Sequence, residues 1–151
     1  MALVKKISDL TAKSADLESS DLFAIAEDDG AGGYVTKKIT GTEILDGMRL
    51  SVRSVSTFPH TLTLGDSNKF LLLDSSSANN TTIPPNSSIA FPIGMRIEIT
   101  QEGTGQSRIL AGVGVTLKSL GGADKMTGQY ANATLIKTGT DEWYFYGSIR
   151  T

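Results

Sequence analysis

The chain of 151 residues carries 14 Lys and Arg against 16 Asp and Glu, with a single His and no Cys. This length allows one compact domain, or one domain with an appendage, and is too short for two ordinary enzyme domains. The net charge of −2 offers no basic footprint for nucleic acid, and the lack of Cys excludes disulfides and thiolate chemistry. A charged fraction of only 20% together with 16 Gly predicts strands joined by tight turns rather than helices.

Charge and apolar pattern both change near residue 50. Residues 1–50 hold 6 basic and 9 acidic side chains, a net charge of −3, whereas residues 51–151 hold 8 basic and 7 acidic ones, a net charge of +1. We therefore expect an N-terminal segment over residues 1–50 and a β-domain over residues 51–151. Every apolar run is far shorter than the roughly 18 residues of a membrane-spanning helix, so we expect no membrane insertion.

The N-terminal segment is predicted to contain one hairpin and one short helix. Residues 21–26 and 34–39 have strand composition, and the Asp- and Gly-rich stretch between them supplies the turn. Thr40 and Glu43 then fit a capping box that opens a helix through Met48. These elements bury too little apolar surface to be stable alone, so we expect them to need the rest of the chain or other chains.

The second part is predicted to be a mainly β domain, an antiparallel β-sandwich or jelly-roll-like fold. Short strand patterns separated by turn signals recur along it, as they do in such folds. The clearest alternation places Met95, Ile97 and Ile99 inward. The predicted strands cover residues 60–64, 69–74, 81–83, 95–100, 108–111, 114–118, 130–137 and 142–149.

No enzyme motif emerges from the sequence. The stretch from Gly103 to Gln106 lacks the P-loop spacing and its Lys-Ser/Thr pair, so a hairpin turn is favoured over a phosphate loop. The carboxylates at residues 27–29 lack the spacing of a calcium loop and are interpreted as a hairpin tip. His60 is expected to be a surface or interface residue rather than a catalytic one. We therefore predict a protein that is not an enzyme, with no catalytic residue, metal site or cofactor.

The last predicted strand carries aromatic residues on both faces. Trp143 and Phe145 alternate with Tyr144 and Tyr146, so each pair points to its own side. One pair is expected in the core of the domain. The other is expected against a neighbouring subunit or, as the alternative, a stacked sugar ring.

The N-terminal residues form a pattern of apolar, acidic and basic positions. The pattern has Ile7 and Leu10, then the acidic and apolar residues 15–25, then residues 37–40 with the sequence Lys-Lys-Ile-Thr. This pattern resembles the leader of tailed-phage virion proteins, where it opens tail fibres, head fibres and related appendages.

The second half resembles the β-rich module that often follows this leader. The matching residues are 82–84, 91–97, 99–105, 114–117, 128–137 and 140–147. The resemblance implies a structural protein of the virion, assembled in the cytoplasm of the host bacterium, that forms a homotrimer on capsid, tail or neck proteins. No shaft of repeats separates leader and module, which favours a short knob, head fibre or capsid decoration over a long tail fibre. The resemblance brings no catalytic residues with it.

Two sets of residues are candidates for contacts with partners. The expected docking and oligomer residues are apolar positions of the first part: Leu17, Leu22, Phe23, Ile25 and Ile39. The alternative function, a glycan-binding receptor module, would use exposed aromatics and polar loop side chains. Its candidates are Tyr130, Tyr144 and Tyr146, with loop residues near Asn79, Asn80, Asn86 and Asn132.

Overall fold

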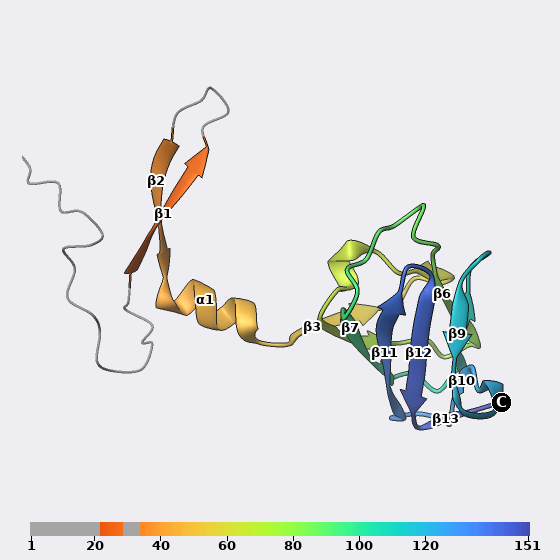
Figure 1. Ribbon diagram of the computed structural model, residues 1–151. Coiled ribbons are helices and arrows are strands. Elements are labelled where there is room, and N and C mark those ends of the chain that lie inside the picture. Colours follow the sequence, from red (N-terminus) through yellow and green to blue (C-terminus); the bar gives the residue numbers. More distant parts are fainter. Residues whose placement is uncertain (1–21, 29–33) are drawn as a thin grey trace, which may run out of the picture. The chain divides into compact units, whose positions relative to one another are not determined.

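The computed structural model describes residues 22–28 and 34–151, and it is mainly β with one short helix. Contacts within the chain divide it into two units, residues 1–49 and residues 50–151 (Figure 1). The division falls beside the boundary expected from charge and apolar pattern. Among the described residues, no helix has the length and apolar character needed to cross a membrane.

The first unit contains the predicted hairpin and helix. Strands β1 (Leu22–Asp28) and β2 (Tyr34–Thr40) pair antiparallel, and helix α1 (Gly41–Met48) follows directly. Thr40 Oγ1 accepts a 3.1 Å hydrogen bond from the backbone N–H of Glu43, and Glu43 Oε2 accepts one of 2.7 Å from the N–H of Thr40. These reciprocal bonds satisfy two backbone donors at the start of the helix and confirm the predicted capping box.

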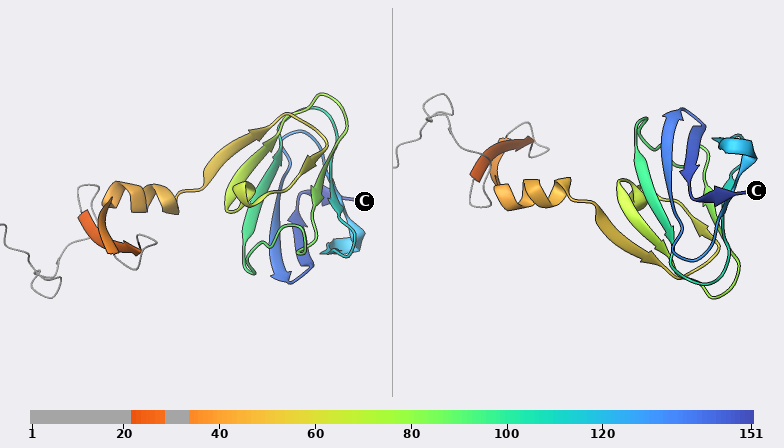
Figure 2. Two further views of the ribbon diagram at one scale, coloured as in Figure 1. Left: turned by 90° about the horizontal axis from the view of Figure 1, so that it is seen from above. Right: turned by 90° about the horizontal axis from the view of Figure 1, so that it is seen from below.

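The second unit, the β-domain, consists of two sheets (Figure 2). One has six strands in the order β3-β5-β7-β11-β12-β9, and the other has five in the order β13-β10-β8-β6-β4. The strands are β3 (Ser51–Val55), β4 (His60–Thr61), β5 (Lys69–Leu73), β6 (Asn79–Ile83), β7 (Arg96–Gln101), β8 (Ser107–Ala111), β9 (Thr116–Lys118), β10 (Lys125–Met126), β11 (Asn132–Gly139), β12 (Glu142–Gly147) and β13 (Ile149–Arg150).

The first six strands of the β-domain wind between the two sheets. From β3 to β8 the chain passes from one sheet to the other at every connection, so each strand pairs in parallel with the strand two positions earlier. Strands β10, β11, β12 and β13 then add antiparallel pairs, and β9 lies parallel to β12.

The mainly β fold class is therefore confirmed, whereas the expectation of antiparallel pairing throughout the domain is wrong for β3 to β8 and for β9 with β12. Alternating hydrophobicity reports which face of a strand is buried and does not report the direction of its neighbours. Parallel strands need a crossover, and here the strand in the opposite sheet takes the place of the usual helix. Strands β3, β10 and β13 were not predicted as separate strands, and β10 and β13 have two residues each.

The apolar core lies between the two sheets. Met95, Ile97 and Ile99 are buried, as their alternation predicts. Trp143 is 1% exposed and packs edge-on against Phe91, with ring centroids 5.4 Å apart. The other buried apolar residues of this core are Val55, Leu62, Leu71, Leu73, Ile83, Ile109, Met126, Ala131, Ala133, Leu135 and Phe145.

The connection from β7 to β8 packs on the connection from β5 to β6. The N–H of Gly105 donates to the carbonyl of Ser75 at 2.8 Å. A Cβ atom at Gly103 would lie 2.1 Å from the Ser75 oxygen, and one at Gly105 would lie 2.0 Å from the Ser77 oxygen. The predicted hairpin turn at this stretch is wrong, because β7 and β8 belong to different sheets. The two glycines allow successive crossings between the sheets to lie backbone against backbone.

Candidate functional site

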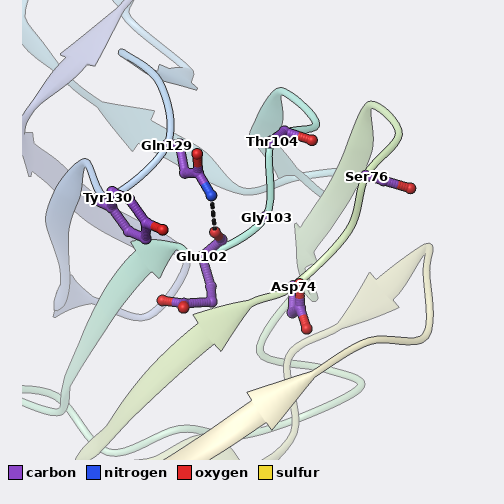
Figure 3. Close-up of a pocket in the computed structure, with 7 residues that line it drawn as sticks. All are labelled: Asp74, Ser76, Glu102, Gly103, Thr104, Gln129 and Tyr130. Carbon is purple, nitrogen blue, oxygen red and sulfur yellow. Dashed lines mark hydrogen bonds between the residues drawn. The ribbon is translucent and has the colours of Figure 1, made fainter.

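A hollow of about 340 Å³ lies where these stacked connections meet the turn before β11 (Figure 3). Tyr130 and Glu102 lie on one side of it, and Asp74 and Ser76 lie across from them. The remaining lining residues are Gly103, Thr104 and Gln129. The hollow therefore brings together side chains from three separate segments of the chain.

Tyr130 holds an unusual backbone conformation at the rim of this hollow. Its φ is +65°, a region that residues with a bulky side chain rarely adopt, and the residue is 68% exposed. Its N–H donates to the carbonyl of Gln101 at 2.7 Å, and the N–H of Gln101 donates to the carbonyl of Ala131 at 3.1 Å. Backbone bonds on both sides of Tyr130 thus hold the strained turn and keep the ring outside the core.

The two loops that form the hollow are tied together by a side chain. Gln129 Nε2 donates to the carbonyl oxygen of Glu102 at 3.0 Å (Figure 3). The Glu102 N–H in turn donates to the carbonyl of Leu73 at 2.9 Å, which ties this loop to the end of β5. The lining residues are therefore held by the backbone of neighbouring strands, which suits a preformed binding site.

The lining of the hollow is rich in hydrogen-bond acceptors. Asp74 and Glu102 supply carboxylates, Ser76 and Thr104 supply hydroxyls, and Tyr130 adds an aromatic ring. Asp74 is exposed and Glu102 is half-buried, so both carboxylates are accessible to a ligand. The arrangement is suited to hydrogen-bonding a polyhydroxylated ligand with one apolar face.

The outer face of the six-stranded sheet is a second exposed surface. Trp143 and Phe145 are each 1% exposed, whereas Tyr144 is 43% exposed and Tyr146 is 50% exposed. The predicted division of these four aromatics between two faces is confirmed. By strand register, the outer face comprises Val52, Ser54, Phe70, Leu72, Arg96, Glu98, Thr100, Asn132, Thr134, Ile136, Tyr144, Tyr146, Thr116, Lys118 and Glu142.

The centre of the outer face is polar, and its groups bond to one another. Glu98 is 7% exposed, and its carboxylate pairs with the Arg96 guanidinium and accepts a 2.7 Å bond from Thr134 Oγ1. Asn132 Nδ2 donates to Thr100 Oγ1 at 3.0 Å. The polar side chains of β7 and β11 therefore satisfy each other within one chain.

The β9 edge of this face carries an ion pair beside a tyrosine. Lys118 Nζ lies 2.6 Å from Glu142 Oε2 and 5.3 Å from the centre of the Tyr144 ring. The hydrogen bond to Glu142 raises the pKa of Lys118. Hydrogen bonds from Lys118 and from the Thr138 hydroxyl lower the pKa of Glu142. The lysine thus holds its charge over the ring as a cation–π contact.

The structure places the candidate docking residues on the hairpin where it describes them. Leu17 lies outside the described residues. Leu22, Phe23 and Ile25 belong to β1, and Phe23 lies opposite Ile39 of β2 in the antiparallel register. Ile39 is half-buried. All four described positions therefore belong to one two-stranded element.

The three candidate tyrosines do not form one site. Tyr130 lines the hollow, whereas Tyr144 and Tyr146 lie on the outer face of the sheet. Two of the asparagines considered with them have structural roles instead. Asn79 is buried, and Asn86 Oδ1 accepts a 2.5 Å bond from the buried Lys137.

Sequence reasoning missed a buried carboxylate between β4 and β5 of the β-domain. Asp66 is fully buried, pairs with the Arg53 guanidinium and lies 3.2 Å from His60 Nε2. Thr63 donates to it through its N–H at 2.8 Å and through its hydroxyl at 3.0 Å. His60 is thus half-buried and joins a structural network. The sequence signal was the Thr63–Asp66 spacing of a capping box, followed by a 3-10 turn (Leu64–Asp66).

Across residues 22–28 and 34–151, no three His, Asp or Glu side chains gather closely enough to hold a metal ion. Comparison of the sequence with family models and with curated proteins finds no match.

Proposed function

We propose that this chain is a structural component of a tailed-phage particle, a short fibre or capsid decoration that forms a homotrimer. Residues 1–50 dock on capsid, tail or neck proteins, and the β-domain is displayed outward. The observation that carries the proposal is the resemblance of residues 6–40 and 82–147 to a virion leader and its β-module.

The division of the structure supports this assignment of roles. The described residues of the first unit form one hairpin and one helix of eight residues, and such an element gains stability from a partner surface. The β-domain has its own two sheets and its own apolar core. A docking segment and a self-sufficient displayed domain are what an appendage on a particle requires.

Deletion of residues 1–48 tests the proposal on assembled particles. The remaining chain should keep the circular dichroism of a folded β-protein and should be lost from purified particles. A finer test compares the incorporation of two serine variants into particles. Phe23→Ser should reduce it, because Phe23 pairs with Ile39 on the hairpin. Met48→Ser is the control, because Met48 is 78% exposed at the helix end. Particles decorated at the normal level by the truncated chain would show that docking does not require the N-terminal segment.

A second candidate function is glycan binding, and the hollow at Tyr130 favours it. Tyr130, whose backbone φ is +65°, presents an exposed aromatic ring beside two carboxylates. The ring offers stacking to a sugar, and the carboxylates offer hydrogen bonds. Binding on a glycan array should be lost with Tyr130→Ala and kept with Tyr144→Ala, the matched change on the sheet. Equal binding by both variants and the unchanged chain would remove the hollow as the sugar site.

A further inference from the structure

Two separated strands of the six-stranded sheet carry apolar side chains on both faces. In β5, Leu71 is fully buried toward the core, while Phe70 and Leu72 are half-buried on the outer face. In β12, Trp143 is buried toward the core and Tyr144 is 43% exposed on the outer face. Strands that are apolar on both sides are typical of sheets with both faces covered. Within residues 50–151, the second sheet covers the inner face, and no strand of the β-domain covers the outer face.

The apolar residues of the outer face form two separate halves. The aliphatic half consists of Val52, Phe70 and Leu72 on β3 and β5, and Val52 is 65% exposed. The tyrosine half consists of Tyr144 and Tyr146 on β12, with the half-buried Ile136 of β11 opposite Tyr144. Four strand spacings of about 4.8 Å separate β3 from β12, so Val52 and Tyr144 lie roughly 19 Å apart. The two halves are therefore too far apart to cover each other within one chain.

The charges of the outer face are already paired within the chain. Arg96 pairs with Glu98, and Lys118 pairs with Glu142, so the face has two cations, two anions and no net charge. Two copies of this face can approach each other without like-charge repulsion. A strongly charged partner would find no unpaired charge among these four side chains, which favours a second copy of the chain as the occupant.

We propose that copies of this chain associate through the outer face, with the tyrosine half of one copy against the aliphatic half of the next. Tyrosines bury a large ring at low entropic cost and keep the hydroxyl at the wet rim, which makes them frequent anchors of interfaces. A contact between two different patches forms a closed ring when the rotation from one copy to the next closes, and a trimer is the smallest such ring beyond a dimer. The inference rests on the homo-oligomer of the proposed function and gives it a contact surface in the β-domain.

Engineered cysteines test the contact directly, because the natural chain has no Cys. In a variant with both Val52→Cys and Tyr144→Cys, the two thiols are too far apart to bond within one chain, since a disulfide needs Cα atoms within about 7 Å. Oxidation of the full-length protein should therefore yield covalent trimers on a non-reducing gel. The matched control is Val113→Cys with Tyr144→Cys, because Val113 is 95% exposed on a loop outside the sheet. It should yield far less cross-linked product.

A second measurement does not depend on disulfide geometry. Tyr144→Ser combined with Tyr146→Ser should weaken self-association of the full-length chain by about tenfold or more in analytical ultracentrifugation, as loss of a central tyrosine pair does. Tyr130→Ser, at an exposed tyrosine that does not belong to the outer face, should leave the association unchanged. The near-ultraviolet signal of the buried Trp143 should confirm that both variants are folded.

The outcomes separate this inference from the proposed function. Cross-linking with weakened association in the tyrosine variant supports the contact, and covalent dimers without trimers support it while overturning the trimer. An oligomer that forms no specific cross-link and tolerates both serine substitutions overturns the outer face as the contact and leaves docking on the particle untouched. A full-length chain that is monomeric at high concentration overturns both the contact and the homotrimer.

Discussion

Lys137 Nζ donates a 2.5 Å hydrogen bond to Asn86 Oδ1, across 51 residues of sequence. The lysine is 2% exposed, and its second acceptor is the carbonyl oxygen of Phe91 at 2.8 Å. A buried ammonium group depends on such acceptors, because burial removes the water molecules that would otherwise accept its hydrogen bonds. The loop before β7 is thereby fastened to β11.

Replacement of Asn86 by Ala should destabilise the β-domain by about 1.5–3 kcal/mol, the range for a hydrogen bond to a charged group. The backbone N–H of Asn86 also donates to Asp141 Oδ1 at 2.6 Å, so the loop should stay in place in the variant. Urea unfolding measures the loss. Asn80→Ala is the matched control, because Asn80 is exposed on β6, and it should cost well under 1 kcal/mol. Equal losses in the two variants would contradict this role of Asn86.

Asp66 contacts Arg53 of β3, His60 of β4 and Thr63, and its charge should contribute to the stability of the β-domain. Asp66→Asn keeps the shape of the side chain and removes the charge that faces Arg53 and His60. Breaking a fully buried pair costs about 3–5 kcal/mol, but the Arg53 side chain is 40% exposed and can turn to water, so we expect about 2–3 kcal/mol. Thermal unfolding of Asp66→Asn and of Asp74→Asn, an exposed aspartate, compares the two. A stable Asp66 variant would mean that the network contributes little.

Gly103 should tolerate no side chain, although the sequence presents it as an ordinary turn glycine. A Cβ atom there would lie 2.1 Å from the backbone oxygen of Ser75, and a backbone atom cannot rotate away. Gly103→Ala should therefore cost about 3 kcal/mol or more, or prevent folding. Gly128→Ala is the control, because a Cβ atom at Gly128 meets nothing within 4 Å. Equal stability of the two variants would show that the stacked connections separate easily.

The same glycine illustrates how far the sequence could predict the fold. Local chemistry sufficed for the hairpin, for the Thr40–Glu43 capping box and for the alternation of β7 and β12, because each of these depends on neighbouring residues. The winding between two sheets depends on pairings such as Phe70 with Glu98, between strands that are not consecutive along the chain. Alternation reads the same for parallel and antiparallel neighbours, so the parallel pairs could not be inferred from it.

The candidate site was predicted in part for a similar reason. The outward position of Tyr144 follows from alternation along one strand. The hollow depends on three loops that come together only after the winding, and the φ of Tyr130 depends on the backbone bonds that Tyr130 and Ala131 form with Gln101. The contact of Asp66 with Arg53 and His60 joins residues from successive strands of opposite sheets, and these three residue types at that spacing match no local motif.

The ion pair of Lys118 and Glu142 predicts a pH dependence with a definite sign. The pKa of Glu142 is lowered from 4.5, chiefly by the hydrogen bond from Lys118 and next by that from Thr138. A carboxyl group with a lowered pKa stabilises the folded state above its usual pKa, and this contribution disappears as the pH falls through the lowered value. The pKa of Lys118 is raised from 10.5, chiefly by the same hydrogen bond, so its contribution disappears as the pH rises through the raised value.

The difference in melting temperature between the unchanged chain and Glu142→Gln should therefore be present at neutral pH and vanish in strong acid. It should be small, because the two side chains are 43% and 37% exposed, and it should shrink further in about 1 M salt, where charges are screened within about 3 Å. Glu102→Gln, a carboxylate in the hollow with no ion pair among the described contacts, is the matched control. A Glu142→Gln difference that persists at low pH and high salt would assign the effect to packing rather than to charge.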